Sequence, residues 1–315
     1  MKKYIVAVSG GLDSVTLLHL LTSHPAPSSA SRRMERGVAL TPLRALRLNS
    51  KFVVAHINHG IRPDSDKTEQ FVRNLAIGYN LKFVSTKLKL KGVSEAESRD
   101  ARYQALFKLK DELGAEGIIT AHNLNDTLET AIINLTRGTG WRGLCSLGSN
   151  NQIIRPLLNL SRAQISTIAA AANLSWHEDS TNSDEKYLRN HIRKNVIPTL
   201  SSSQLKQLSL IILNLKNIKS ELDDILNQLI EYGDDGSLSL NRSWLIKLDD
   251  KTISEALVHI LPKFGATYDK KVVSSLLRFC LDAVNGKKFL QAGKNVKVKT
   301  IRMGRDYQIK FSRLN

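Results

Sequence analysis

The residues best suited to chemistry lie in a short glycine-rich stretch near the start of the chain. This stretch spans residues 9–14 and consists of Ser9, Gly10, Gly11, Leu12, Asp13 and Ser14. The two glycines allow a tight turn and a close approach of the backbone to a ligand, because neither carries a Cβ atom. Amide N–H groups of such a turn, and of a helix that starts there, can converge on phosphate oxygens. The stretch therefore predicts a phosphate-binding loop.

Asp13 suits this loop only if a cation is bound beside it. Its carboxylate would repel bare phosphate, so we expect Mg²⁺ to bridge Asp13 and the phosphate oxygens. The simpler interpretation is a helix N-cap, in which Asp13 or Ser14 satisfies the free amides of the first turn. Two glycines, an acid and two serines between a strand and a helix favour the nucleotide site over the cap.

Two other nucleotide-binding motifs are excluded. The chain contains no GxxxxGK followed by Ser or Thr, which excludes a Walker-type NTPase. Residues 138–143 read GTGWRG and match GxGxxG, but they follow a helix-like segment. The dinucleotide fingerprint requires a strand at that place, so we interpret this match as fortuitous.

The segments around the loop predict an α/β fold with a mainly parallel, Rossmann-like sheet. Strands are predicted at 3–8, 51–57, 81–88 and 117–120, and helices at 14–21, 64–79, 95–113, 126–137 and 161–172. Such alternation indicates βαβ units. Ligands of these sheets bind at the carboxyl ends of the strands. We therefore expect the polar residues that follow the strands, including Ser9, His59 and His122, to converge there.

Charge is distributed unevenly along the 315 residues, which carry a net charge of +17. Residues 286–315 contain nine basic residues and one acidic residue, whereas residues 200–285 are nearly neutral. This density suits a nucleic-acid backbone, where each neutralised phosphate releases counterions; a merely solvated basic surface is the simpler alternative. We predict a catalytic domain over 1–200 with a basic insertion at about 23–50, a linking helix over 201–234 and a small basic α+β domain over 235–315. The last would contain helices near 252–261 and 269–284, and turns at Gly293 and Gly304.

Composition excludes several classes of protein. A hydrophobic content of 42% indicates a globular chain. Two cysteines, Cys145 and Cys280, are too few for a disulfide scaffold or a four-cysteine zinc site. No apolar run approaches the roughly 20 residues of a membrane helix, and the apolar stretch at the start is too short for a signal peptide. We therefore expect a cytoplasmic protein with a polyanionic partner and no membrane association.

Further motifs resemble those of one enzyme family. Residues 9–14 match the SGGxDS loop of the PP-loop ATPases, which split ATP into AMP and pyrophosphate. An ordered series up to about residue 198 resembles the tRNA(Ile)-lysidine synthases, over almost two thirds of the chain. The series comprises HINHGIR at 56–62, Glu95 with Arg99, Arg102 and Tyr103, HNLNDTLET at 122–130, RGTG at 137–140, RPLL at 155–158, and DSTN at 179–182 with Tyr187, Arg189, Asn190 and Arg193.

The resemblance implies a reaction in two steps. Family members adenylate the C2 oxygen of the wobble cytidine in the CAU anticodon of tRNA(Ile) and release pyrophosphate. The amine of free lysine then attacks C2 and expels AMP, which gives lysidine and changes the codon read from AUG to AUA. Attack requires a neutral amine, so a nearby carboxylate could accept its proton. ATP, Mg²⁺, lysine and tRNA(Ile) are the implied ligands, and a homodimer is left open.

The resemblance also implies roles for residues outside the loop. Asp126 and Glu129, spaced i, i+3, would hold the amino groups of lysine; an exposed acidic helix face is the alternative. Arg99 and Arg102 would brace phosphates or the charge that develops at the cytidine, although arginines at this spacing often lie at the surface. His59 would line the nucleotide site with residues 9–14, unless it is a structural histidine.

The chain departs from the family pattern at Asn123 and Asn125, where His and Asp are usual. An amide keeps hydrogen bonding but removes a negative charge, which weakens the case for cation or lysine binding. These two residues favour one alternative, a degenerate PP-loop module that binds RNA without turnover. A tRNA 2-thiocytidine synthetase would need the paired cysteines that this chain lacks, and a small-molecule amidating ligase would leave the basic tail without a purpose.

Overall fold

The computed structural model describes residues 1–22, 43, 46, 50–60, 64–88, 95–150, 152–177, 188–266, 268–282, 289–292 and 295–314. The chain forms two compact units, Met1–Lys216 and Asn217–Asn315, which divide within the long helix α10 (Ser202–Gln228). Most of the predicted 23–50 insertion, the DSTN motif at 179–182 and the turn at Gly293 lie outside the described residues. No described helix is both long and apolar enough to cross a membrane.

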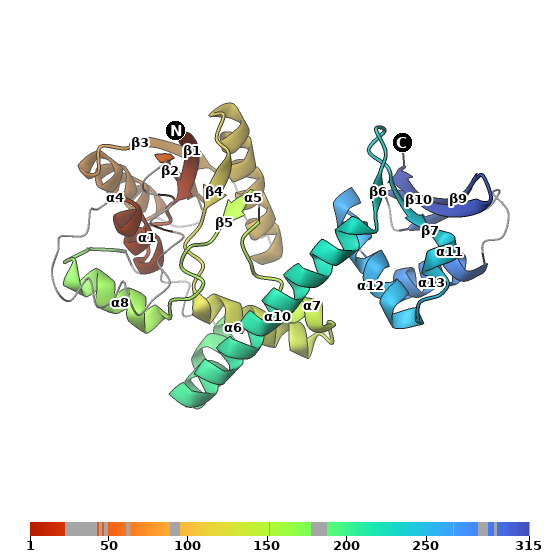
Figure 1. Ribbon diagram of the computed structural model, residues 1–315. Coiled ribbons are helices and arrows are strands. Elements are labelled where there is room, and N and C mark those ends of the chain that lie inside the picture. Colours follow the sequence, from red (N-terminus) through yellow and green to blue (C-terminus); the bar gives the residue numbers. More distant parts are fainter. Residues whose placement is uncertain are drawn as a thin grey trace. The chain divides into compact units, whose positions relative to one another are not determined.

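The first unit is built on a parallel five-stranded sheet in the order β3-β2-β1-β4-β5 (Figure 1). Its strands are β1 (Lys2–Ala7), β2 (Ser50–Asn58), β3 (Lys82–Lys87), β4 (Gly117–Ile119) and β5 (Ile153–Ile154). Its helices are α1 (Leu12–Thr22), α4 (Ser65–Gly78), α5 (Glu95–Glu112), α6 (Leu124–Thr136), α7 (Trp141–Leu144), α8 (Arg162–Ala171) and α9 (Leu188–His191), with η2 (Ile192–Val196) and η3 (Ile197–Thr199). The predicted mainly parallel fold is confirmed. Strand β5 was not predicted, because two residues are too few for an alternating pattern.

Successive residues of the central strands pack against helices on opposite faces of the sheet. Val6 of β1 belongs to a buried cluster with residues of α1, α4 and α8, among them Leu18 and Ile165. Its neighbour Ile5 instead packs with Leu106 of α5. Figure 1 shows the same division of the helices. Each such side chain stabilises the fold by about 1.5–3 kcal/mol, so burial on both faces holds the strand ends in place.

The strand order determines where a ligand can bind. From β1 the chain continues to β2 and β3 on one side of the sheet, and later returns to β4 and β5 on the other side. The loops that leave β1 and β4 therefore diverge at the carboxyl edge, the place where ligands of such sheets bind, and we call the space between these loops the crevice. Residues 9–11 follow β1, and residues 120–123 follow β4. The two sets of polar residues predicted from the sequence thus lie at the same edge of the sheet.

The second unit is a small α+β domain with an antiparallel sheet in the order β6-β7-β10-β9-β8. Its strands are β6 (Glu231–Tyr232), β7 (Leu238–Asn241), β8 (Phe289–Ala292), β9 (Val296–Met303) and β10 (Asp306–Arg313). Its helices are α11 (Arg242–Leu245), α12 (Asp250–Ile260), η4 (Leu261–Phe264) and α13 (Lys270–Asp282). Leu257, Val298 and Phe311 are fully buried in its core. The predicted helices and the turn at Gly304, where φ is +62°, are present.

Candidate functional site

The glycine-rich loop closes on itself through its two serines. The Ser14 hydroxyl donates to the Gly11 carbonyl over 2.9 Å and lies 3.2 Å from the Ser9 hydroxyl. The Gly11 amide donates to the Ser9 hydroxyl over 3.4 Å. The loop leads directly into α1, whose first-turn amides have no partner within the helix. The arrangement leaves several N–H groups at one end of the crevice, as a phosphate site requires.

Gly10 is the position where only glycine fits. Its φ angle is +92°, a conformation that side chains with a Cβ rarely adopt. A Cβ placed there would lie 2.8 Å from Cγ2 of Thr68 and 3.4 Å from Cγ2 of Val72. The Gly10 carbonyl accepts a hydrogen bond of 3.0 Å from the His177 amide. Helix α4 and His177 thus pack against the glycine-rich loop, and the sequence motif indicated neither contact.

Asp13 has one carboxylate oxygen that the described residues leave unsatisfied. Oδ1 is buried without a hydrogen-bond partner among those residues, and Oδ2 lies 3.7 Å from Nη1 of Arg162. Burial raises the pKa of Asp13, Arg162 opposes this and the charge of Asp126 adds to it. A buried polar atom without a partner requires an explanation. A bound cation would provide one, and Mg²⁺ is commonly held by one or two carboxylates together with substrate phosphates and water.

The loop after β4 is organised by the two asparagines that depart from the family pattern. The Asn123 side chain accepts from the Asp126 amide over 3.1 Å, and Asp126 Oδ2 accepts from the Asn123 amide over 2.9 Å. This reciprocal capping box fixes the start of α6. Asn125 Oδ1 accepts from the Arg162 amide, over 3.0 Å, at the start of α8. Both asparagines therefore have a structural use.

Asp126 and Glu129 lie together on α6, as expected, and both face Arg193 of η2. Nε and Nη2 of Arg193 donate to the two oxygens of Glu129 over 2.6 and 2.9 Å. Nη2 is also 3.4 Å from Asp126 Oδ1. Glu129 is fully buried, which raises its pKa, while Arg193 acts in the opposite direction. The sequence motif contained Arg193, but nothing in the motif indicated this contact.

Several arginines lie near His122, which follows β4. The Cζ atoms of Arg99 and Arg102, both on α5, lie 5.1 and 5.4 Å from the ring centre of Tyr103. Burial lowers the pKa of His122 to about 2, with further contributions from Arg155, Arg99 and Arg102. His122 is therefore neutral at physiological pH. The two arginines expected at the site are thus gathered with Arg155 near the residues that follow β4.

A family model for the PP-loop domain matches residues 1–200. The chain belongs to the PP-loop domain family. Sequence relatives include the tRNA(Ile)-lysidine synthases of Shewanella woodyi, 34% identical over 64% of this chain and 40% of that protein, and of Buchnera aphidicola, 33% identical over 72% and 50%. The chain thus spans about half the length of these curated relatives.

A solved structure supports the same fold. The U34-tRNA thiolase of Methanococcus maripaludis superposes with a TM-score of 0.51, covering 68% of this chain and 71% of that one. The sequences are 16% identical, so this likeness concerns the fold alone.

The PP-loop assignment agrees with the exclusion of the GxGxxG match. Residues 138–143 follow α6 and lead into α7, so no strand precedes them. Among the motif positions, residues 61, 62, 179–182 and 187 are not part of the described structure. His59 lies directly after β2, which is the neighbour of β1 in the sheet.

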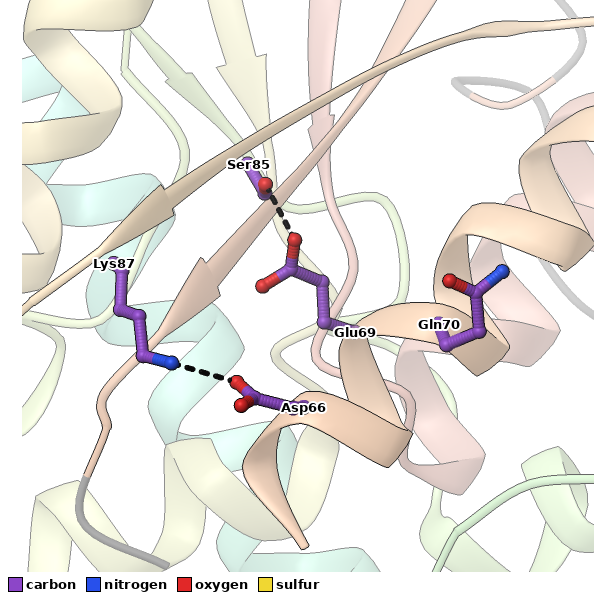
Figure 2. A pocket seen from close by; sticks show the side chains of 5 residues that line it. All are labelled: Asp66, Glu69, Gln70, Ser85 and Lys87. Atoms are coloured by element: carbon purple, nitrogen blue, oxygen red, sulfur yellow. Dashed lines mark hydrogen bonds and ion pairs between the residues drawn. The ribbon is translucent and has the colours of Figure 1, made fainter.

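A polar cavity of about 470 Å³ lies between α4 and β3. Lys87 donates to Asp66 over 2.8 Å and Ser85 donates to Glu69 over 2.7 Å; Figure 2 marks both contacts. The Asn58 side chain donates to both carboxylates over 2.9 Å. It also accepts from the Gly60 amide over 2.9 Å. Because these groups satisfy one another, we interpret the cluster as a brace for the turn after β2.

Proposed function

We propose that this protein is a tRNA(Ile)-lysidine synthase, which uses ATP to join free lysine to C2 of the wobble cytidine in a CAU anticodon. The observation that carries the proposal is the meeting of two loops at the switch point. Asp13 of the phosphate-binding loop and Asp126 at the start of α6 interact electrostatically there. Nucleotide phosphates and a substrate amine would therefore share one crevice. The names of the sequence relatives support the same reaction.

The residues of the crevice suit both half-reactions. Loop amides and the serine hydroxyls would hold ATP phosphates, while Asp13 would hold Mg²⁺, which neutralises charge on the phosphates. Asp126 has an 18% exposed side chain and can receive the lysine ammonium or its proton. Arg99 and Arg102 would stabilise negative charge near the cytidine. Adenylation makes the C2 oxygen a good leaving group, so the amine attacks only after the first step.

The second unit offers a surface for the tRNA backbone. Lys270, Lys271 and Arg278 of α13 are exposed and line a cavity of about 490 Å³ with Ser274 and Ser275. Phosphate contacts of this kind would position the RNA without reading its sequence. We expect tRNA affinity to fall steeply between 50 and 200 mM salt, as it does when several phosphates are neutralised. Filter binding at several salt concentrations measures this slope, and a flat salt dependence would contradict the assignment.

Pyrophosphate release tests the proposed reaction. Purified protein is supplied with ATP, Mg²⁺, lysine and tRNA(Ile) transcripts that carry either a CAU or a GAU anticodon. Release with CAU only, together with labelled lysine retained on the RNA, is the expected result. Tight tRNA binding without turnover on either transcript would instead favour the degenerate RNA-binding module.

Thiolation chemistry fits the cysteines poorly. Cys145 and Cys280 are both buried. Burial raises the pKa of Cys280 to about 12, so this thiol stays protonated and unreactive. A 2-thiocytidine synthetase is therefore the weaker alternative.

Asn125→Asp is expected to change the rate of adenylation by less than about threefold, because a carboxylate oxygen can still accept the hydrogen bond from the Arg162 amide. Substitutions of this kind shift the free energy of unfolding by only about 0.5 kcal/mol. The added negative charge also lies at the start of α8, where the helix dipole favours it. Pyrophosphate release at saturating ATP gives the comparison. An increase of the adenylation rate by tenfold or more would instead show that Asn125 marks an active site that has lost activity.

A further inference from the structure

The contacts of Glu129 leave it no room for a substrate. Its side chain has 0% exposure, and both of its oxygens accept hydrogen bonds from Arg193. Nε of a second arginine, Arg189, lies 3.6 Å from Glu129 Oε2. Removing one partner of a buried ion pair costs about 3–5 kcal/mol. An incoming lysine would have to meet that cost, and its ammonium cannot reproduce the parallel hydrogen bonds of a guanidinium.

Arg193 is only partly covered by these contacts. Its bonds to Glu129 and Asp126 are made by Nε and Nη2, and its side chain is 30% exposed. Asp13 is near enough for its charge to act on the guanidinium, so Arg193 lies close to the PP-loop. A partly exposed guanidinium at this place is suited to an anion.

The charge balance of the crevice also calls for an anion. The carboxylate of Asp126 interacts electrostatically with those of both Asp13 and Glu129. Six arginines interact with these carboxylates or with His122, namely Arg99, Arg102, Arg155, Arg162, Arg189 and Arg193. Among the described residues positive charge is therefore in excess, and a polyphosphate or an adenylate would neutralise it.

We propose that Glu129 is a positioning residue that holds Arg193 against the α-phosphate of the nucleotide, so that Asp126 is the carboxylate left to bind lysine. This inference rests on the proposed function and changes the role that the family resemblance implies for Glu129. Glu129 then serves the adenylation step, which precedes the arrival of the amine. Arg193 stabilises the negative charge of the α-phosphate while pyrophosphate leaves.

The test separates the two half-reactions. Adenylation is followed without lysine, as transfer of label from the α-phosphate of ATP to the CAU transcript, and the KM for lysine is measured in the complete reaction. Glu129→Gln is expected to lower the adenylation rate about 100-fold, as loss of a preorganised charge contact does, and to leave the KM for lysine within about twofold. Asp126→Asn is expected to raise the KM for lysine by a larger factor than it lowers adenylation.

Two further variants keep the test decisive. Arg193→Lys retains a cation for Glu129 but lacks the second N–H group, so it should show the same loss of adenylation. It provides the test if Glu129→Gln fails to fold. Glu112→Gln removes a 54% exposed carboxylate at the end of α5 and should behave as wild type. Melting temperatures of all variants show which of them are folded.

The opposite pattern would overturn the proposal. If Glu129→Gln adenylates at the wild-type rate but requires about tenfold more lysine, then Glu129 binds lysine directly. If the wild-type protein adenylates no tRNA at all, the proposed function fails, whereas the inference is still tested by nucleotide affinity. Arg193→Lys and Glu129→Gln should each weaken binding of a fluorescent ATP analogue about tenfold, and unchanged binding would refute the contact with the α-phosphate.

Discussion

Asp13→Asn is expected to reduce adenylation of the CAU transcript by at least about 100-fold, the usual result of losing a preorganised charge contact at a reacting centre. The substitution preserves the size of the side chain. It removes the negative charge whose buried oxygen Oδ1 has no partner among the described residues. Transfer of labelled AMP measures the first step, and filter binding measures tRNA affinity. That affinity should stay within about twofold, because the charge lies in the crevice and phosphate contacts dominate affinity for RNA.

The matched control is Asp111→Asn, which alters a 71% exposed carboxylate paired with Lys110. It should leave both measurements unchanged, since surface pairs contribute at most about 1 kcal/mol. An equal loss of adenylation and tRNA binding in Asp13→Asn would show a damaged fold and contradict the assigned role.

The same carboxylate sets a pH dependence for the wild-type protein. Because burial raises the pKa of Asp13 above its ordinary value of 3.8, the group is protonated at a higher pH than a free aspartate. The charged form of Asp13 would bind the cation, so the adenylation rate should be at its maximum above the raised pKa and should fall as the pH drops through that pKa. Asp13→Asn should remove this acidic limb from whatever residual activity remains.

Gly10→Ala is expected to reduce kcat/KM for ATP about 100-fold, because a shift of about 1 Å in a positioning loop can have that effect. A Cβ at a φ of +92° strains the backbone, and it would lie 2.8 Å from Cγ2 of Thr68. Thr68 cannot move aside easily, since its hydroxyl interacts with the Asp64 carbonyl and with His177. Adenylation kinetics at varied ATP concentration and thermal melting check the prediction.

Gly114→Ala is the control that separates backbone strain at a positive φ from displacement of the phosphate-binding loop. Gly114 has a φ of +59°, yet a Cβ there would have no heavy atom within 4 Å. This variant should lose about 1–2 kcal/mol of stability, the cost of a left-handed residue, and keep the wild-type KM for ATP. If Gly10→Ala shows no more than this loss, the close approach of α4 does not position the loop.

Local features of the first unit could be predicted from the sequence because they depend on neighbouring residues. The glycine-rich loop follows a strand and opens α1, as its residue types indicated. Ser161 and Gln164 form a reciprocal cap at the start of α8, which lies within the helix predicted over 161–172. Helical and strand periodicity repeats over a few residues, so the longer helices and strands were placed within a few positions, whereas the four-residue helices α7 and α9 were not predicted. Strands β5 and β6 have only two residues each, and no pattern indicated them.

Two properties of the candidate site were decided only by the tertiary structure. Glu129 and Arg193 are 64 residues apart in the chain, and their contact arises where α6 packs beside η2. The sequence could indicate that both residues belong to one motif, but burial determines that Glu129 faces an arginine and not a substrate. Asn123, an apparent defect of the motif, is the cap of α6. Each role depends on which groups the fold removes from water and which it leaves exposed, and that is a property of packing between distant segments.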